Sequence, residues 1–133
     1  MAYVNSTIAQ GGFGSFKVDA AGALTLYQRV KFTTTADAAG KPTIAAAGAT
    51  DRAVGVVMIP GAVGDYVTIR FLNAQGEQFG LASGSIGLGV QLYQGSAGKL
   101  TASSGGGALV AGISTTPGYD GGPFTYMVQP NYA

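Results

Sequence analysis

The stretch from Arg52 to Leu72, RAVGVVMIPGAVGDYVTIRFL, decides the fold of this chain. An apolar run from Ala53 to Ile59 leads into a glycine-rich turn at residues 60–65, and a second run follows from Tyr66. In that second run apolar and polar residues alternate, which is the period-two pattern of a half-buried strand. The stretch therefore predicts two strands joined by a turn.

Similar patterns predict strands elsewhere in the chain. The segments are residues 23–33, 42–47, 86–92, 109–113 and 124–128. In the first of them we expect one face to carry Leu24, Leu26, Val30 and Phe32; in 86–92 it carries Ile86, Leu88, Val90 and Leu92. Since no helical period survives for eleven residues, the pattern predicts an all-β protein.

The chain resembles itself, and this internal repeat shapes the whole interpretation. Residues 26–28 (LYQ) recur at 92–94, residues 40–43 (GKPT) at 98–101 (GKLT), and the PG of residues 60–61 at 117–118. Residues 67–69 recur as 124–126, and Phe71 as Val128. We predict two tandem β-units, at about 24–72 and 86–129, that share one core in a small β-barrel or sandwich within a single domain at residues 23–133.

Composition limits the chemistry available to this protein. The 133 residues include no Cys and no His, only 10% are charged, and the formal net charge is +1. Thiolate sites, disulfides and histidine catalysis are excluded, and the charge gives no long-range attraction for nucleic acid or an anionic membrane. We expect no cofactor, no metal site, no nucleic-acid partner and no membrane partner.

The candidate catalytic residues have a simpler structural explanation. Asp65 and Asp120 lie in corresponding turns, where Asp is at home, and are the best candidate pair of facing carboxylates. Gly40-Lys41 lacks the residues that complete a phosphate-binding loop. Arg29, Lys31 and Arg70 are expected on a solvated outer face. We predict that the chain is not an enzyme.

Residues 1–22 lack a sustained period and are interrupted by glycines at 11, 12 and 14. They are typical either of a partly ordered terminus or of an arm that docks on a neighbouring subunit by strand addition. The candidate partner-binding residues of this N-terminal arm are Tyr3, Val4, Ile8, Phe13 and Phe16.

The repeated scheme of apolar strand, GK turn, RAVGVV (residues 52–57), Gly64-Asp65 turn and alternating strand resembles the capsid cement, or head decoration, proteins of tailed bacteriophages. The resemblance covers residues 24–129, and the turn at 117–123 departs from it by placing Asp before Gly.

This resemblance implies a small β-barrel, a homotrimer and the major capsid protein as partner, on the exterior of the virion after synthesis in the host cytoplasm. It implies a mechanical role at capsid-subunit junctions. The alternative is another virion or surface β-module, such as a tail component or a carbohydrate-binding domain with Tyr27 and Tyr93 as stacking residues.

Overall fold

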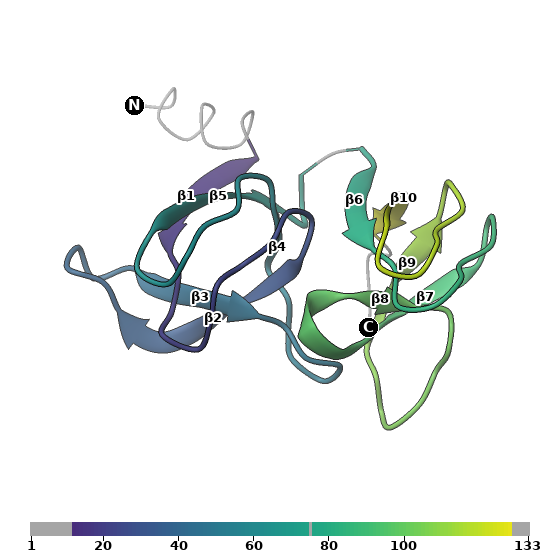
Figure 1. Cartoon of the computed structure of the whole chain (residues 1–133), viewed down its shortest axis with the longest axis horizontal. Coiled ribbons are helices and arrows are strands. Elements are labelled where there is room, and N and C mark those ends of the chain that lie inside the picture. The colour runs from purple at the N-terminus through teal and green to yellow at the C-terminus, as the bar shows by residue number, and fades with distance from the viewer. Residues whose placement is uncertain (1–11, 75, 129–133) are drawn as a thin grey trace.

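The computed structural model describes residues 12–74 and 76–128 (Figure 1). Its regular elements are β-strands, apart from one short 3-10 turn, and turns and loops connect them, which confirms the all-β class. The elements are β1 (Phe13–Lys17), β2 (Arg29–Ala36), β3 (Pro42–Ala46), β4 (Gly55–Val57), β5 (Tyr66–Phe71), β6 (Gln78–Leu81), β7 (Gln91–Gln94), η1 (Ser96–Gly98), β8 (Leu100–Thr101), β9 (Val110–Ser114) and β10 (Pro123–Val128).

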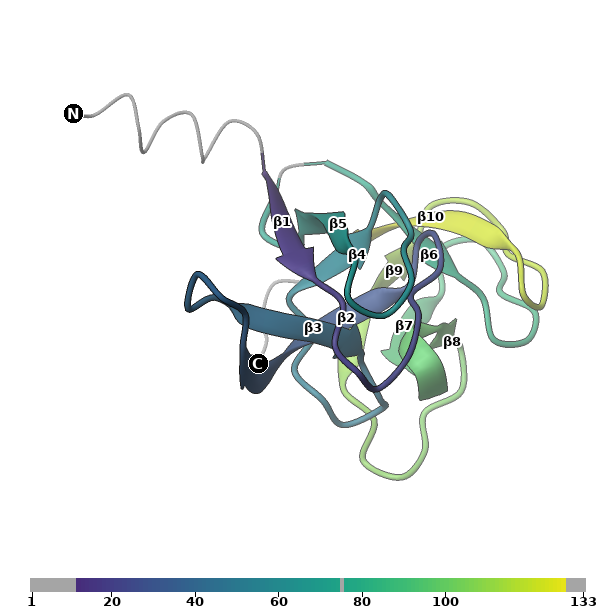
Figure 2. The ribbon, with the colours of Figure 1, turned by 60° about the vertical axis from the view of Figure 1, so that its left-hand side comes forward.

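The strands form two five-stranded sheets with the same topology. The first has the order β1-β5-β4-β2-β3 and the second β6-β10-β9-β7-β8. Each strand of the first sheet thus has a counterpart at the same place in the second. We call β1–β5 unit 1 and β6–β10 unit 2; they lie side by side in Figures 1 and 2. The prediction of two tandem β-units is confirmed.

Both sheets curl and close in the same way. A parallel bridge joins Val18 to Ile44, beyond the end of β1, and its counterpart joins Ala82 to Leu100 beyond the end of β6. The Pro-Gly turns also fold back alike, because Gly61 bridges Leu24 and Gly118 bridges Ile86. The Pro-Gly turns identified in the sequence are therefore equivalent, and each unit is a small, partly closed barrel.

Strand register confirms one part of the repeat and corrects another. Gly55 faces Phe71 and Gly112 faces Val128, as the matched segments predicted. However, Val30 faces Gly55 in unit 1 while Leu92 faces Gly112 in unit 2. Leu92 is therefore equivalent to Val30, not to Leu26, and the LYQ match was wrong.

The GK match was wrong for a similar reason. Phe32 faces Ile44 in unit 1 and Gln94 faces Leu100 in unit 2, so Leu100 is the counterpart of Ile44. Gly40-Lys41 therefore corresponds to residues 96–97, two positions before Gly98-Lys99. Turn residues recur because turns need them, and they do not by themselves mark equivalent positions.

Two predicted strands begin later than the alternation suggested. Tyr27 has a φ of 70° and lies in a turn, so β2 starts at Arg29, and Leu26 is exposed. In residues 86–92 only β7 is a strand, and Leu88 is exposed in the preceding loop. Apolar and polar residues alternate in both segments. However, the chain before each strand first pairs with the Pro-Gly turn of its unit, through Leu24 or Ile86, and then turns before the strand begins.

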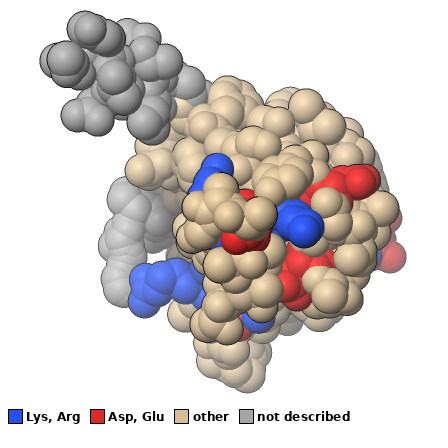
Figure 3. All heavy atoms as spheres, turned by 90° about the vertical axis from the view of Figure 1, so that its left-hand side faces the viewer, with Lys and Arg blue, Asp and Glu red and all other residues tan. Residues whose placement is uncertain are grey.

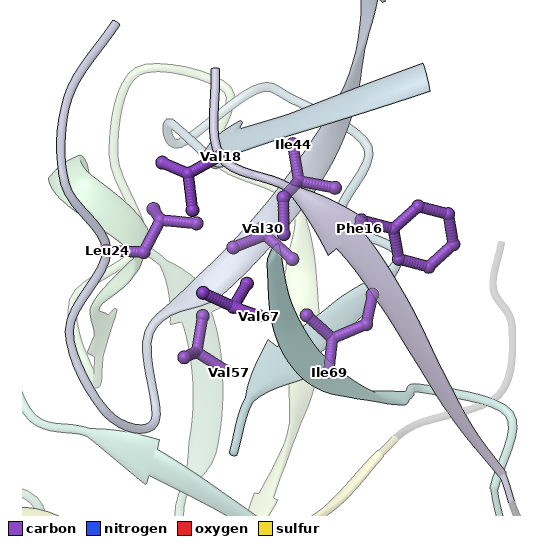
Figure 4. Close-up of a cluster of buried hydrophobic side chains, with 8 residues drawn as sticks. All are labelled: Phe16, Val18, Leu24, Val30, Ile44, Val57, Val67 and Ile69. Carbon is purple, nitrogen blue, oxygen red and sulfur yellow. The ribbon is translucent and has the colours of Figure 1, made fainter. Parts of the chain in front are cut away.

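Each unit buries its own core, which corrects the expectation of one shared core. The core of unit 1, drawn in Figure 4, contains Phe16, Val18, Leu24, Val30, Ile44, Val57, Val67 and Ile69. The core of unit 2 contains Ala82, Ile86, Leu92, Leu100, Ala111, Phe124 and Tyr126. Closure of each curled sheet removes enough apolar surface from water for a separate core.

The two cores hold their aromatic rings on different strands. Phe16 on β1 faces Val67 on β5, whereas Gly80 on β6 faces Phe124 on β10. A Cβ at Gly80 would lie 3.0 Å from Tyr126 and 3.3 Å from Phe124. The larger side chains of β10 thus occupy the space that Phe16 fills in unit 1.

Residues 13–22 of the predicted N-terminal arm belong to the fold. β1 pairs antiparallel with β5 of its own chain, from Phe13 opposite Arg70 to Lys17 opposite Tyr66. Strand addition therefore occurs, but within the chain. A Cβ at Gly14 would lie 2.6 Å from the ring of Phe71 and 2.8 Å from the ring of Phe16, so a larger residue there would displace these rings.

Candidate functional site

The five candidate arm residues have three different outcomes. Phe16 is buried in the core of unit 1, so it packs against its own chain and not against a neighbour. Phe13 lies on the outer face of β1 and is half exposed. Tyr3, Val4 and Ile8 lie outside the described residues. Of the described candidates, only Phe13 presents a surface to a partner.

The candidate carboxylates serve as turn residues in the structure. Asp65 Oδ2 accepts a hydrogen bond from Ala62 N–H at 3.0 Å, and Asp120 Oδ1 accepts one from Gly84 N–H at 2.9 Å. Within the part of the chain that the structure describes, no group of three His, Cys, Asp or Glu side chains could hold a metal ion. No described helix is long and apolar enough to cross a membrane.

A shallow hollow on unit 1 contains the ion pair between Lys31 Nζ and Asp51 Oδ2, 2.9 Å apart. Both side chains are about one-third exposed. Asp51 Oδ2 also accepts a hydrogen bond from Gly48 N–H at 2.8 Å. This bond and, after it, the Lys31 ammonium hold the pKa of the Asp51 carboxyl below its ordinary value.

Acidification is expected to remove the stabilisation that Asp51 provides. The pKa of Asp51 is lower in the folded chain than in the unfolded chain, so its contribution is complete above an ordinary pKa of 3.8 and disappears as pH falls through the lowered value. Thermal unfolding of wild type and Asp51→Asn at about pH 6 and about pH 2.5 measures this. We expect the two melting temperatures to converge at the lower pH; a gap of constant size would contradict the assignment.

The junction between the units depends on Arg29, a residue whose role the sequence did not reveal. The alternation placed Arg29 on a solvated face with Lys31 and Arg70, yet its side chain is 4% exposed. Its Nη1 donates to Tyr126 Oη at 2.7 Å, and its Nη2 donates to Gln94 Oε1 at 3.1 Å. The outer face of unit 1 is buried here because unit 2 packs on it, and a strand pattern carries no signal of such packing.

Further polar contacts join the same two surfaces. Gln94 Nε2 donates to the carbonyls of Gly48 at 3.0 Å and Asp51 at 2.6 Å. Gly98 N–H donates to Ala47 O at 2.7 Å, and a Cβ at Gly98 would lie 2.6 Å from Arg29 O. The backbones of η1 and β2 therefore approach closely, and the junction is a hydrogen-bonded one.

The two tyrosines of the carbohydrate-binding alternative do not form a shared platform. The ring of Tyr27 stacks on Phe79 of its own chain, with centroids 4.6 Å apart and an interplanar angle of 16°. Tyr93 lies in β7, and its hydroxyl accepts a hydrogen bond from Gln91. Tyr27 lies in a turn of unit 1, so Tyr27 and Tyr93 are not at equivalent positions. The ring of Tyr27 also already stacks on Phe79.

Exposed apolar side chains gather on the outer face of unit 2. Ile113 on β9 directly faces Met127 on β10, and the two are 44% and 57% exposed. Leu109 and Val110, at the start of the same strand, are also exposed. Patches of this kind on a folded chain mark surfaces that contact a partner.

Charged side chains are few in this protein, with seven Lys or Arg and six Asp or Glu. Figure 3 shows blue and red side chains interspersed on one face of the molecule, and most of that face is uncharged. An electrostatic site for a polyanion would need basic residues gathered together. The apolar outer face of unit 2 is therefore the clearest candidate for binding.

The whole fold has a solved counterpart. The chain is similar to the head fiber gp8.5 N base of bacteriophage phi29, with a TM-score of 0.72 over 91% of this chain and 98% of that one. Sequence identity is 16%, so the likeness shows a common fold. No protein-family model matches the chain, and no curated protein matches it.

Proposed function

We propose that this protein is a structural component of a phage virion that binds the outside of the head. The observation that carries the proposal is the likeness to a head fiber base over nearly the full length of both chains. The repeated scheme, which resembles the capsid cement proteins, points to the same particle. In its finer form, the protein decorates junctions between major capsid protein subunits as a homotrimer and stabilises the shell.

The physical character of the described surface supports a mechanical role. Its exposed apolar residues lie on two partly closed barrels, each with its own core. Weak contacts that repeat at many sites on a shell add up through multivalency. A role without catalysis agrees with turn-bound carboxylates and with a sequence that contains no His or Cys.

A fiber base is the second candidate function, and the coverage of the structural match favours it. In that case the protein anchors a fiber to the head and does not seal junctions. The two roles differ in what depends on the protein, because heads without a cement protein lose stability, whereas heads without a fiber base lose the fiber and keep their stability. Melting temperatures of heads with and without the protein distinguish the two roles.

Binding to heads tests the proposal directly. Purified full-length chain is sedimented through a sucrose gradient with expanded empty heads of the phage that encodes it, with unexpanded heads as the control. We expect the chain to travel with expanded heads and to raise their melting temperature. Failure to travel with either kind of head would overturn the proposal.

A deletion that tests the arm hypothesis must be shorter than the predicted arm of residues 1–22. β1 begins at Phe13, so a deletion that tests the arm should remove residues 2–11 and leave the strand intact. If Tyr3, Val4 and Ile8 contact the capsid, this variant keeps its melting temperature and loses head binding. Unchanged binding would show that the arm is dispensable.

A further inference from the structure

The two units of one chain are joined end to face. Three side chains at one end of unit 2, Gln78, Gln94 and Tyr126, meet the outer face of unit 1. There Tyr126 and Gln94 accept hydrogen bonds from Arg29, and Gln78 Nε2 lies 3.5 Å from Phe71 O. We call these three residues the docking end of unit 2.

Val56 shows that the outer face of unit 1 is covered. It alternates with the core residue Val57 and so points away from the core of unit 1. It is nevertheless 0% exposed, because β4 lies against β6 of unit 2. Arg29, Val56 and Arg70 form a row of direct neighbours across β2, β4 and β5. This row is the receiving face of unit 1.

Unit 2 has the same face, and no strand of the described part of the chain (residues 12–74 and 76–128) pairs across it or packs on it as unit 2 does on unit 1. Gln91, Ile113 and Met127 form the equivalent row across β7, β9 and β10. Charged residues stand at two positions of this row in unit 1, whereas unit 2 has one polar and two apolar residues. Ile113 and Met127 are the exposed side chains described above, so the receiving face of unit 2 is apolar and open.

Unit 1 likewise has the counterpart of the docking end. By register, Gly14, Phe32 and Ile69 stand where unit 2 has Gln78, Gln94 and Tyr126. Phe16 packs on Phe32 with centroids 5.1 Å apart and on Phe71 with centroids 6.0 Å apart. Phe32 is 40% exposed. Gly14 has no side chain and Ile69 is buried in the core, so the docking end of unit 1 presents the Phe32 ring where that of unit 2 presents two amides and a hydroxyl.

The docking ends and the receiving faces of the two units differ in a complementary way. Inside the chain a polar end meets a face that carries a buried guanidinium. Phe32 at the end of unit 1, and Ile113 and Met127 on the face of unit 2, are exposed. We propose that the aromatic docking end of unit 1 in one copy binds the apolar receiving face of unit 2 in a second copy. Burial of Phe32 against Ile113 removes apolar area from water, and the thioether of Met127 makes favourable contacts with aromatic rings.

This contact repeats between chains the end-to-face joint that already links the units within one chain. Because it joins two different surfaces, it is heterologous and either closes into a ring or extends as a filament. Copies associate through these two surfaces whether or not the protein also binds a capsid. Head binding and self-association are measured separately, so the two proposals can fail independently.

Two complementary variants test the contact in the full-length chain. Ile113→Asp damages the receiving face and leaves the aromatic end intact; Phe32→Asp does the reverse. Leu88→Asp is the matched control, because Leu88 is 70% exposed in the loop before β7 and belongs neither to the docking end nor to the receiving face. Light scattering after size exclusion, over a range of concentrations, gives the mass of each variant alone and of an equal mixture.

We expect the wild type and Leu88→Asp to be oligomers, and each single variant to associate at least about tenfold more weakly. The mixture should form a 1:1 dimer of two 13.2 kDa chains, because one intact end meets one intact face. Thermal melting followed by circular dichroism shows whether the variants fold. If Ile113→Asp does not fold, Met127→Lys takes its place as the variant of the receiving face.

Three results would overturn the proposal. The first is a wild-type chain that stays monomeric at the highest concentration. This holds even if the variants lose head binding, because the two surfaces would then bind the head and not a second copy. The second is a pair of folded variants that keep the wild-type mass. The third is a mixture of the two variants that yields no heterodimer. That result would indicate a contact in which both copies use the same surface, because mixing does not restore such a contact.

Discussion

Replacing Arg29 with alanine is expected to lower the free energy of unfolding by about 2–4 kcal/mol and the melting temperature by roughly 10 °C. The guanidinium is 4% exposed and donates to Tyr126 Oη and Gln94 Oε1. Its removal leaves two buried polar groups without these donors and a hole at the junction of the units. Urea-induced unfolding measured by circular dichroism gives the change.

Two further variants separate the hydrogen bonds from general effects of losing an arginine. Arg52→Ala removes an exposed arginine and should change stability by less than about 0.5 kcal/mol. Tyr126→Phe removes one hydroxyl, and a double-mutant cycle with Arg29→Ala should give a coupling of about 1 kcal/mol. If Arg29→Ala unfolds at the wild-type urea concentration, Arg29 does not hold the units together.

Replacing Gly112 with alanine is expected to cost at least about 3 kcal/mol, although alanine is the smallest change possible. A Cβ on Gly112 would fall on the carbonyl oxygen of Met127, a backbone atom of the paired strand β10. β9 and β10 would have to move apart, which breaks the register that closes unit 2. Thermal and urea unfolding of Gly112→Ala measure the loss.

Comparison with two other glycines calibrates that result. The equivalent Cβ at Gly55 would lie 2.8 Å from Arg70 O, so Gly55→Ala should cost less, about 2 kcal/mol. Gly105 has nothing within 4 Å of such a Cβ, and Gly105→Ala should be within about 0.5 kcal/mol of wild type. Equal stability of all three variants would contradict the close approach of the paired strands.

Local chain chemistry accounts for what could be predicted. The alternation at Val67–Phe71 and at Phe124–Val128 predicted β5 and β10, because a strand with one buried face needs that period. The Pro-Gly turns predicted the repeat, and the bridges at Gly61 and Gly118 confirm it. The boundaries of β2 and β7 were missed, since alternation alone does not show where the backbone turns.

The candidate binding surface was less accessible to sequence reasoning. Phe16 was expected to contact a partner and is a core residue, whereas Ile113 and Met127 were expected only as parts of strands. An exposed apolar residue has the same spacing in the sequence as a buried one. Which of the two it becomes depends on the position of the other unit.

The sequence by itself determined the class of fold, the duplication and the absence of histidine and cysteine chemistry, because period, turn residues and composition are local properties of the chain. Only the tertiary structure decided that Arg29 is buried while its counterpart Gln91 is exposed, and that Val56 is covered while Ile113 is open. The two units are built alike, but unit 2 covers the outer face of unit 1, and no unit of this chain covers the same face of unit 2.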